Sequence, residues 1–441
     1  MNWSELCLKN SFFGINTTTL ADIHIIIYLL FRLRFMKISD GNSLILKLML
    51  INISTGIAMG MMNLILPIYA LSLDATSTEI GLIKGISGVG DLLVVLPAGF
   101  LVDYLGSKRM YSVSAVMGAL TIISISFATS IEFLLLIMVF FGMARTLRTT
   151  SLSADFFKHM NAIGTKRGGW FKGSMTMGGG FIGPMVGGIA AVAVGFTGYF
   201  ALASAFLLAP FMVIIARANT GNNPQIKPRN SSFQDASNHY RALIKNRTLT
   251  SATIIESLNS AFFITFATFI TVLVIRDLGL SPGVAAIMIS LKGAATILVV
   301  FFFGHLVLRN NNNLYLFSFA ITILGLLVLG LSRDTLLLAV ASIILGVGSG
   351  MITLTTFTQV GNIDGEKGKI AGIFSMGLGM GSIIGPTLGG VIGDYFGVQA
   401  IFLAFMVPFG ALIIYTFLNG KRIIQTESGA RNTVPNIQED F

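Results

Sequence analysis

Residues 179–188 read GGFIGPMVGG, and residues 381–390 read GSIIGPTLGG. Four glycines and one proline recur between the two stretches at a constant offset of 202 residues. A second match relates residues 93–102 to residues 298–307. The chain is therefore predicted to consist of two similar halves, and repeated halves with a binding site between them near the bilayer midplane are typical of transporters. The repeated residues are Gly179, Gly183, Pro184, Gly187 and Gly188 in the first copy and Gly381, Gly385, Pro386, Gly389 and Gly390 in the second.

The composition is that of a membrane protein. Of the 441 residues, 54% are hydrophobic and only 11% are charged, whereas soluble domains carry roughly 25% charged residues. This composition therefore argues against a soluble globule, a disordered chain and a nucleic-acid-binding domain. The single cysteine, Cys7, rules out an internal disulfide or a cysteine-based metal cluster, and the four histidines have no ligand spacing. We expect no metal and no cofactor, and no nucleic acid among the partners.

The apolar segments predict an all-α membrane protein with twelve transmembrane helices in two six-helix bundles. A bilayer crossing needs about 20 apolar residues. The bundles are expected at residues 46–217 and 248–419, joined by a cytoplasmic linker at 218–247 and followed by a cytoplasmic tail at 420–441. The expected crossings are 48–72, 78–102, 110–129, 132–156, 167–194, 197–217, 248–275, 281–308, 313–331, 335–359, 367–392 and 398–419.

The distribution of basic residues fixes the orientation. With the N-terminus in the cytoplasm, 22 of the 29 lysines and arginines fall in cytoplasmic stretches, and 2 fall on the opposite side. The positive-inside rule predicts such a bias, so both termini are expected to be cytoplasmic. The outer loops hold no N-x-S/T sequon, which favours a bacterial inner membrane as the location of this multi-pass protein.

The first 45 residues do not fit the scheme. Residues 23–36 are apolar but too short to span a bilayer, and they contain His24, Arg32 and Arg34. Residues 1–45 could form an N-terminal extension with an interfacial helix. Alternatively, translation starts at Met36, and this stretch lies upstream of the true start. Both possibilities remain open.

Residues 99–109 read GFLVDYLGSKR. This stretch resembles the cytoplasmic loop signature of the major facilitator superfamily, especially its twelve-helix drug–proton antiporters, although Tyr104 replaces a basic residue and Leu308 replaces the aspartate in the second half. The resemblance implies a latch that holds the halves in one state, with Asp155 as the partner of Arg109. The alternative is that the basic residues only retain the loop in the cytoplasm. The latch residues are Gly99, Asp103, Gly106, Lys108, Arg109 and Asp155.

The glycine–proline stretch resembles the antiporter signature of the same family. Proline removes a backbone hydrogen bond and bends a helix, and glycines allow close approach of a neighbour. The segment could rock as the halves move, or it could serve packing alone.

Ionisable residues inside the predicted helices are the candidates for binding and coupling. Each costs at least about 2.5–3.5 kcal/mol at bilayer depth, so each calls for a partner or a cavity. Lys84 and Lys172 are expected to snorkel to the headgroups, and Arg148 could also reach the cytoplasmic side. The deeper residues either line a central cavity or form structural pairs. The candidate residues are Glu256, Asp91, Arg145, Lys292 and Arg148, with Asn259, Asn63 and Gln359 as added hydrogen-bonding groups or as polar contacts between helices.

Glu256 is the first candidate for proton coupling, and Asp91 is the second. A carboxylate at bilayer depth can take up a proton from one side and release it to the other as access alternates. The resemblance supports Glu256 and Arg145, because drug–proton antiporters of the family often use an acid in segment seven and an arginine in segment four. Segment one contains no acid, so the coupling scheme cannot be copied whole.

The sequence therefore predicts a monomeric secondary transporter, surrounded by membrane lipid and not an enzyme, that exports a small organic solute in exchange for protons. Five cations against two acids inside the helices favour an anionic substrate. The alternative is proton-linked uptake of an organic anion or metabolite, such as a siderophore or a sugar-phosphate-like solute. A channel and an intramembrane enzyme are remote possibilities, because the chain has a six-plus-six repeat, no P-loop lysine and no HExxH motif.

Overall fold

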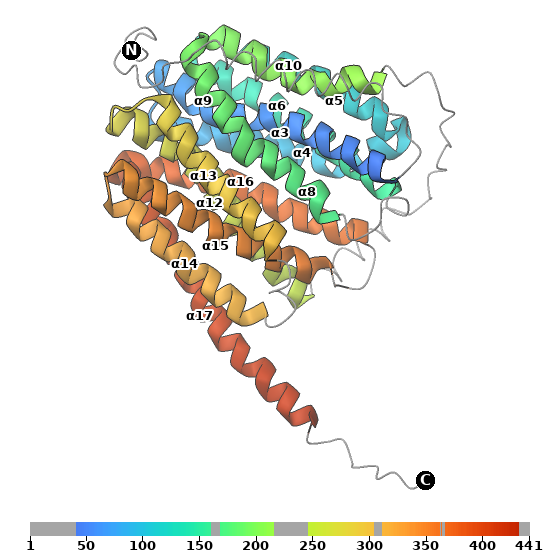
Figure 1. Ribbon diagram of the computed structural model, residues 1–441, viewed down its shortest axis with the longest axis vertical. Coiled ribbons are helices and arrows are strands. Elements are labelled where there is room, and N and C mark those ends of the chain that lie inside the picture. The colour runs from blue at the N-terminus through green and yellow to red at the C-terminus, as the bar shows by residue number, and fades with distance from the viewer. Residues whose placement is uncertain are drawn as a thin grey trace.

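The computed structural model describes residues 41–159, 168–215, 246–303, 311–361, 363 and 367–431. Within these ranges every regular element is a helix, and each of the twelve predicted crossings is occupied by one helix or by consecutive helical segments (Figure 1). The predicted fold class is confirmed. The N-terminal half contains α3 (Gly41–Ser72), α4 (Ser77–Leu105), α5 (Ser107–Ile125), α6 (Ile131–Lys158), α8 (Gly168–Thr176), η3 (Met177–Ile182), α9 (Gly183–Ala193) and α10 (Phe196–Ile215). The C-terminal half contains α12 (Arg247–Val272), η5 (Leu273–Asp277), α13 (Pro282–Phe302), α14 (Asn311–Leu331), α15 (Thr335–Gly361), α16 (Lys367–Phe396) and α17 (Val398–Arg431).

Local sequence signals set the helix ends. Thr76 is the N-cap of α4, and it forms a reciprocal capping box with Glu79, which satisfies two backbone N–H groups. Gly106 ends the same helix with a φ of 86°, a conformation that favours glycine. Gly397 turns the chain between α16 and α17 in the same way, with a φ of 87°.

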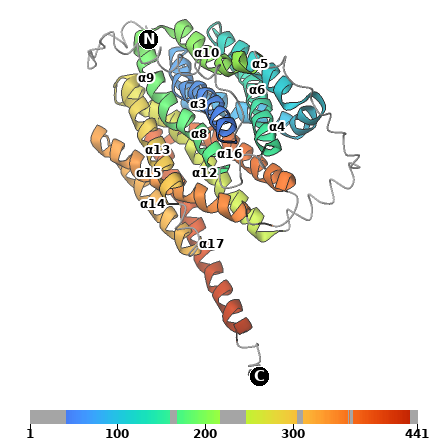
Figure 2. The same ribbon diagram turned by 45° about the vertical axis from the view of Figure 1, so that its right-hand side comes forward.

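The two halves meet through two long helix pairs. Helix α4 of the N-terminal half packs along α16 of the C-terminal half, and α13 packs along α8, η3 and α9. Both ribbon views show α13 beside the α8–α9 segment (Figure 2). We call the end of the bundle with the α3–α4 and α16–α17 connections the outer end, because the charge distribution predicts that it faces away from the cytoplasm.

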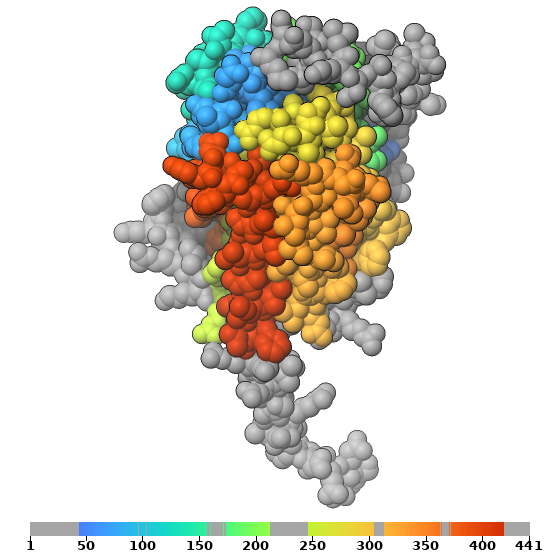
Figure 3. All heavy atoms as spheres, turned by 90° about the vertical axis from the view of Figure 1, so that its left-hand side faces the viewer, coloured from blue at the N-terminus to red at the C-terminus, as the bar shows by residue number. Residues whose placement is uncertain are grey.

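The side chains that point away from the bundle along its helices are mostly apolar. Figure 3 shows α14 and α17 side by side on one face of the C-terminal half, and their outward side chains are large and exposed, with Val407 75% and Leu324 52% accessible. Eight helices in the described ranges are long and apolar enough to cross a bilayer. Apolar side chains that face outward in this number are expected where the solvent is lipid.

The two glycine–proline copies pack against equivalent helices. In the first copy, a Cβ atom on Gly60 of α3 would lie 2.8 Å from Pro184 Cδ and 2.9 Å from Gly183 Cα, so only glycine permits this approach. In the second copy, a Cβ on Gly385 would lie 2.8 Å from Ala261 Cα of α12. The two copies differ around the proline: the π-helix η3 ends two residues before Pro184, whereas α16 runs unbroken through Pro386.

Two predicted segments lie largely outside the described ranges. They are the N-terminal extension, up to residue 40, and the linker, up to residue 245. The last crossing, predicted to end at residue 419, continues as α17 to Arg431 and projects from the bundle (Figure 1).

Candidate functional site

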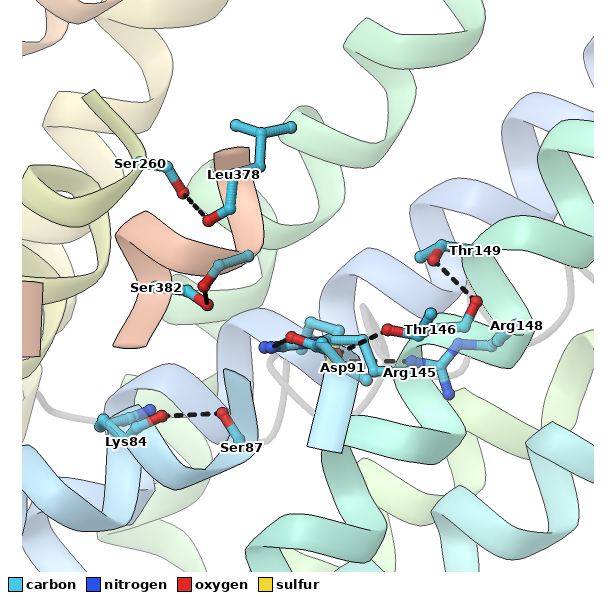
Figure 4. A network of polar contacts seen from close by, with 12 residues as sticks. Lys84, Ser87, Asp91, Arg145, Thr146, Arg148, Thr149, Ser260, Leu378 and Ser382 are labelled. Atoms are coloured by element: carbon cyan, nitrogen blue, oxygen red, sulfur yellow. Dashed lines mark hydrogen bonds and ion pairs between the residues drawn. The ribbon is translucent and has the colours of Figure 1, made fainter. Parts of the chain in front are cut away.

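The N-terminal half holds a carboxylate–guanidinium pair between α4 and α6. Arg145 Nε donates to Asp91 Oδ1 over 3.1 Å, and Arg145 Nη2 contacts Asp91 Oδ2. The hydroxyl of Thr146 also donates to Asp91, over 2.7 Å. Figure 4 shows the three side chains converging from the two helices. The negative charge of Asp91 is thus matched by a fixed cation within the same half.

Lys84 does not snorkel as predicted. It lies two turns before Asp91 on α4 (Figure 4), and the side chain is buried, with only 6% of Lys84 exposed. Its Nζ atom points into the half, 3.4 Å from the Oδ1 atom and 3.5 Å from the backbone oxygen of Asn63, and 3.4 Å from the Met62 carbonyl oxygen. The prediction was wrong because α3 offers acceptors within reach, so the side chain turns inward instead of towards the headgroups. The predicted hydrogen-bonding residue Asn63 is one of these acceptors.

Arg148 is also buried, contrary to the expectation that it reaches the cytoplasmic side. None of its surface is exposed, and Nη2 lies 3.7 Å from the sulfur of Met59. Its Nε and Nη1 atoms have no hydrogen-bond partner among the described residues. A buried guanidinium group with few hydrogen-bond acceptors is stabilised by a negative charge nearby.

The C-terminal half holds a carboxylate in a different environment. Glu256 of α12 is 5% exposed, and α15 supplies its hydroxyl donors. Thr356 donates to Oε2 over 2.9 Å, and Thr353 donates to Oε1 over 3.1 Å. Asn259, one turn along α12, places its Nδ2 atom 3.5 Å from Glu256 Oε2 and 2.9 Å from Thr353 Oγ1. Two hydroxyl groups and one amide group thus contact this carboxylate.

Gln359 lies near the same region, but it bonds elsewhere. Its Oε1 atom accepts a hydrogen bond of 2.9 Å from the hydroxyl of Tyr315, which joins α15 to α14. The amide oxygen of Asn259 has no partner among the described residues. Of these two predicted hydrogen-bonding residues, only Asn259 contacts Glu256 in the bonds described above.

Lys292 lies in an aromatic cage inside the C-terminal half. Its Nζ atom is 4.4 Å from the ring centroid of Phe263, 5.2 Å from that of Phe262 and 5.3 Å from that of Phe266. Only 1% of Lys292 is exposed, and Nζ has no hydrogen-bond partner among the described residues. Cation–π contacts stabilise such an ammonium group, and an anion would do so further.

The predicted latch residues are not joined as expected in this structure. Asp155 Oδ1 lies 3.4 Å from the Ser107 hydroxyl and 3.8 Å from His159 Nδ1, whereas Arg109 and Lys108 are exposed. The pair between Arg109 and Asp155 is not among the ion pairs of the described residues. The backbone places Gly99 near the end of α4 and Gly106 at its turn into α5. The side chains of Asp103 and Lys172 lie outside the described part.

A contact at the outer end was missed by sequence reasoning. Asp394, near the end of α16, accepts hydrogen bonds from the backbone N–H groups of Ser77 and Thr78, over 2.7 Å and 2.8 Å. These residues begin α4 in the other half. The sequence shows that Asp394 follows the second glycine motif, but no local sequence pattern connects it with Ser77, which lies 317 positions earlier.

An apolar groove of about 700 Å³ in the N-terminal half is lined by side chains of α5, α6 and α10. No charged side chain lines it, so it does not have the chemistry of the candidate site. The lining residues are Ser112, Val113, Val116, Met117, Leu120, Thr121, Ser124, Phe140, Met143 and Phe211.

The groups together define two centres, one in each half. Asp91 is paired with Arg145, and Glu256 accepts hydrogen bonds from hydroxyl and amide groups. A hydroxyl both donates and accepts, so it suits either protonation state of a carboxyl group. The hydroxyls of Thr353 and Thr356 can therefore bond to Glu256 whether its carboxyl group is ionised or protonated.

Comparison with known proteins places this chain in a family. The family described as Major Facilitator Superfamily matches residues 48–363 and, in a second match, 253–435. An uncharacterised transporter of this superfamily from Methanocaldococcus jannaschii is 24% identical over 79% of this chain and 91% of its own length. A homologue of the multidrug resistance efflux pump PmrA from Lactococcus lactis is 24% identical over 82% of this chain and 91% of its own length. The crystal structure of the nucleoside transporter NupG superposes with a TM-score of 0.70 at 16% identity, covering 85% of this chain and 98% of NupG.

Proposed function

We propose that this protein exports a small organic solute in exchange for protons. The proposal starts from the family: the chain belongs to the Major Facilitator Superfamily and is a secondary transporter. The proposal of export is supported by the relative from Lactococcus lactis, which is named as a multidrug efflux pump and spans nearly the same length. The proposal of proton exchange rests on the chain itself.

The environment of Glu256 carries the proton proposal. A charged carboxylate at bilayer depth is costly, and Glu256 lies beside groups that can bond to it in either charge state, among them the hydroxyls of Thr353 and Thr356. In the ionised state both hydroxyls donate to the carboxylate. In the protonated state the carboxyl group donates to one of them, because a threonine hydroxyl also accepts. Loading and release of a proton then change the hydrogen bonds between α12 and α15.

Asp91 is the second candidate, and it has a different role in this proposal. Arg145 already balances its charge, so a proton on Asp91 would leave Arg145 uncompensated. We propose that substrate binding, and not direct proton loading, acts on this pair. Arg145 is 24% exposed on its side chain, which leaves part of the guanidinium open to a ligand.

The excess of buried cations supports an anionic group on the substrate. Of the four cations at the candidate site, three lie in the N-terminal half and one lies in the C-terminal half, whereas each half has one carboxylate there. Arg148 and Lys292 are each at most 1% exposed. A carboxylate on the substrate would offset part of this charge. The cations are Lys84, Arg145, Arg148 and Lys292, and the carboxylates are Asp91 and Glu256.

The setting of the transporter is part of the same proposal. We place it as a monomer in a bacterial inner membrane with both termini in the cytoplasm, the orientation that the basic residues favour. Residues 46–217 and 248–419 are the proposed bundles, with residues 218–247 as the connector. The latch between Arg109 and Asp155 is proposed for another state of the cycle, in which α5 and α6 lie differently.

Transport by purified protein in liposomes tests the proton proposal. Ethidium, norfloxacin and fluorescein serve as cationic, zwitterionic and anionic solutes, and accumulation is measured with and without an imposed pH gradient. Glu256→Gln keeps the shape of the side chain and is expected to abolish the response to the gradient. Glu132→Gln, at an exposed carboxylate near the start of α6, is the matched control and is expected to respond like the parent. A normal response of the Glu256 variant would remove this residue from the role.

The second candidate function is proton-linked uptake of an organic anion, which the same excess of buried cations favours. The two functions predict opposite behaviour in intact cells. An uncoupler raises accumulation of the solute if the protein exports it, and lowers accumulation if the protein imports it. One uptake assay with and without an uncoupler therefore decides between them.

A further inference from the structure

The outer end of the interface contains a helix cap that is supplied by the opposite half. The two oxygens of the Asp394 carboxylate accept from consecutive backbone N–H groups of α4, Ser77 over 2.7 Å and Thr78 over 2.8 Å. The next N–H group, that of Glu79, is capped within α4 by Thr76. The first N–H groups of a helix lack partners inside that helix. At α4, a residue 316 positions away satisfies two of them.

A second contact from the C-terminal half reaches the same residue. Arg276, in the last turn of η5, donates from Nη1 to the hydroxyl oxygen of Ser77 over 3.1 Å. Arg276 also bonds to its neighbour Asp277, over 3.0 Å. Ser77 itself is completely buried between these groups. Two separate segments of the C-terminal half, η5 and α16, therefore hold the start of α4.

Close backbone packing accompanies the polar contacts. A Cβ on Gly390 would lie 2.9 Å from the Cα of Thr78, and a Cβ on Gly81 would collide with the carbonyl oxygen of Pro386. These contacts place α4 and α16 at backbone distance next to the cap. The cap and the packing can exist only while the halves are closed together at this end.

The chemistry of the cap favours a contact that is specific and yet breakable. A carboxylate at a helix N-terminus makes charge-assisted hydrogen bonds and interacts favourably with the helix dipole. Asp394 is exposed at the rim of the interface, so water can replace it when the helices separate. Because α4 moves with one half and α16 with the other, opening at the outer end must break both bonds.

We propose that Asp394 is a gating residue, whose cap on α4 holds the outer end closed in the state seen here and must be released before the pathway opens outward. This inference rests on the alternating-access function proposed above. It does not depend on which solute or ion is moved. The role of Asp394 is positional, and no contact with the solute is involved.

Distance measurements across the outer end test this gate. Cys7 is replaced by serine, and spin labels are attached at Thr129→Cys in the N-terminal half and at Leu331→Cys in the C-terminal half, both exposed outer positions. In nanodiscs without solute, Asp394→Ala is expected to raise the ratio of the long to the short distance population about tenfold, which corresponds to ~1.4 kcal/mol. The isosteric Asp394→Asn is expected to shift the ratio in the same direction by less, because it keeps one acceptor.

The matched control is Asp334, also exposed at the outer end. Asp334 caps α15 within its own half, through the N–H groups of Leu336 and Leu337 at 2.8 Å and 3.1 Å. Asp334→Ala removes a helix cap without touching the interface, and its distance ratio is expected to equal that of the parent. An unchanged ratio in both Asp394 variants, or an equal shift in the Asp334 variant, would overturn the proposal. If the Asp394→Ala protein does not fold, the isosteric variant decides alone. Loss of proton coupling in liposomes leaves these distances unaffected, so failure of the proposed function is distinguishable from failure of the gate.

Discussion

The hydroxyl of Thr356 donates a hydrogen bond of 2.9 Å to the carboxylate of Glu256 and thereby joins α15 to α12. Both groups are buried, and the same hydroxyl lies 3.0 Å from the carbonyl oxygen of Ile352 in its own helix. A change in the protonation of Glu256 therefore changes the hydrogen bonds between two helices of the C-terminal half. A transporter that couples proton movement to solute movement requires such a connection between the protonation of a side chain and the contacts between helices.

Removal of this hydroxyl is expected to weaken coupling. Thr356→Val keeps the shape of the side chain but leaves Glu256 without one donor, and the response of transport to a pH gradient is expected to fall severalfold. Thr355→Val is the control, because the buried Thr355 hydroxyl bonds only to the Met351 carbonyl of its own helix among the contacts described. Equal responses of the two variants in liposomes would count against the role of Thr356.

The pair of Asp91 and Arg145 is expected to behave as one unit in stability. Asp91→Asn and Arg145→Gln each leave a partly buried charge without its partner, and each is expected to cost about 2 kcal/mol. This is less than for a fully buried pair, because the side chains are 15% and 24% exposed. The double variant is expected to lose less than the sum of the two single losses. Thermal unfolding in detergent measures the three variants, and strict additivity would contradict the coupling.

Lys292 is expected to be replaceable without loss of stability. Lys292→Met keeps the length of the side chain, removes a buried charge and retains contact with the Phe263 ring through its sulfur. The melting temperature is expected to stay equal or to rise. Lys84→Met is the comparison. It is expected to be destabilising, because the Asn63 Oδ1 atom loses the hydrogen bond that Lys84 donates to it. A larger fall in melting temperature for Lys292→Met than for Lys84→Met would contradict the expectation that Lys292 can be replaced without loss of stability.

The close approach of α3 to the first glycine motif gives a packing prediction. Gly60→Ala places a methyl group 2.8 Å from Pro184 Cδ, and overpacking of this kind typically costs about 1–3 kcal/mol. Gly410→Ala in α17 is the control, because its Cβ meets no atom within 4 Å. Melting temperatures are expected to fall for the first variant and to hold or rise for the second. Parent-like stability of Gly60→Ala would contradict the packing described for α3.

The fold was accessible from the sequence because its signals are local or repeated. Apolar segments of bilayer length predicted where the helices lie, and the recurrence of Gly183–Pro184 as Gly385–Pro386 predicted two halves. The repeat did not reveal that the π-helix η3 occurs in only one copy. That difference depends on the packing of neighbours, which the motif itself does not encode.

The candidate site was accessible only in part. Buried charges such as Glu256 and Asp91 stand out in apolar helices, so the sequence predicted them as candidates. Their partners could not be predicted, because Thr353 and Thr356 look like any polar residues of a membrane helix. Lys84 was assigned to the headgroups from its distance to the helix end, yet the acceptors on α3 decide its direction. The Asp394 cap depends on tertiary structure alone.

Proton movement in liposomes tests the central claim most directly. A pH-sensitive dye such as pyranine inside the vesicles reports protons, while the solute is followed at the same time in exchange and in net transport. The account predicts that Glu256→Gln still exchanges solute for solute across the membrane, because that cycle needs no change of protonation, but moves no protons and builds no gradient. A Glu256→Gln protein that still moved protons with the solute, as the parent does, would contradict it.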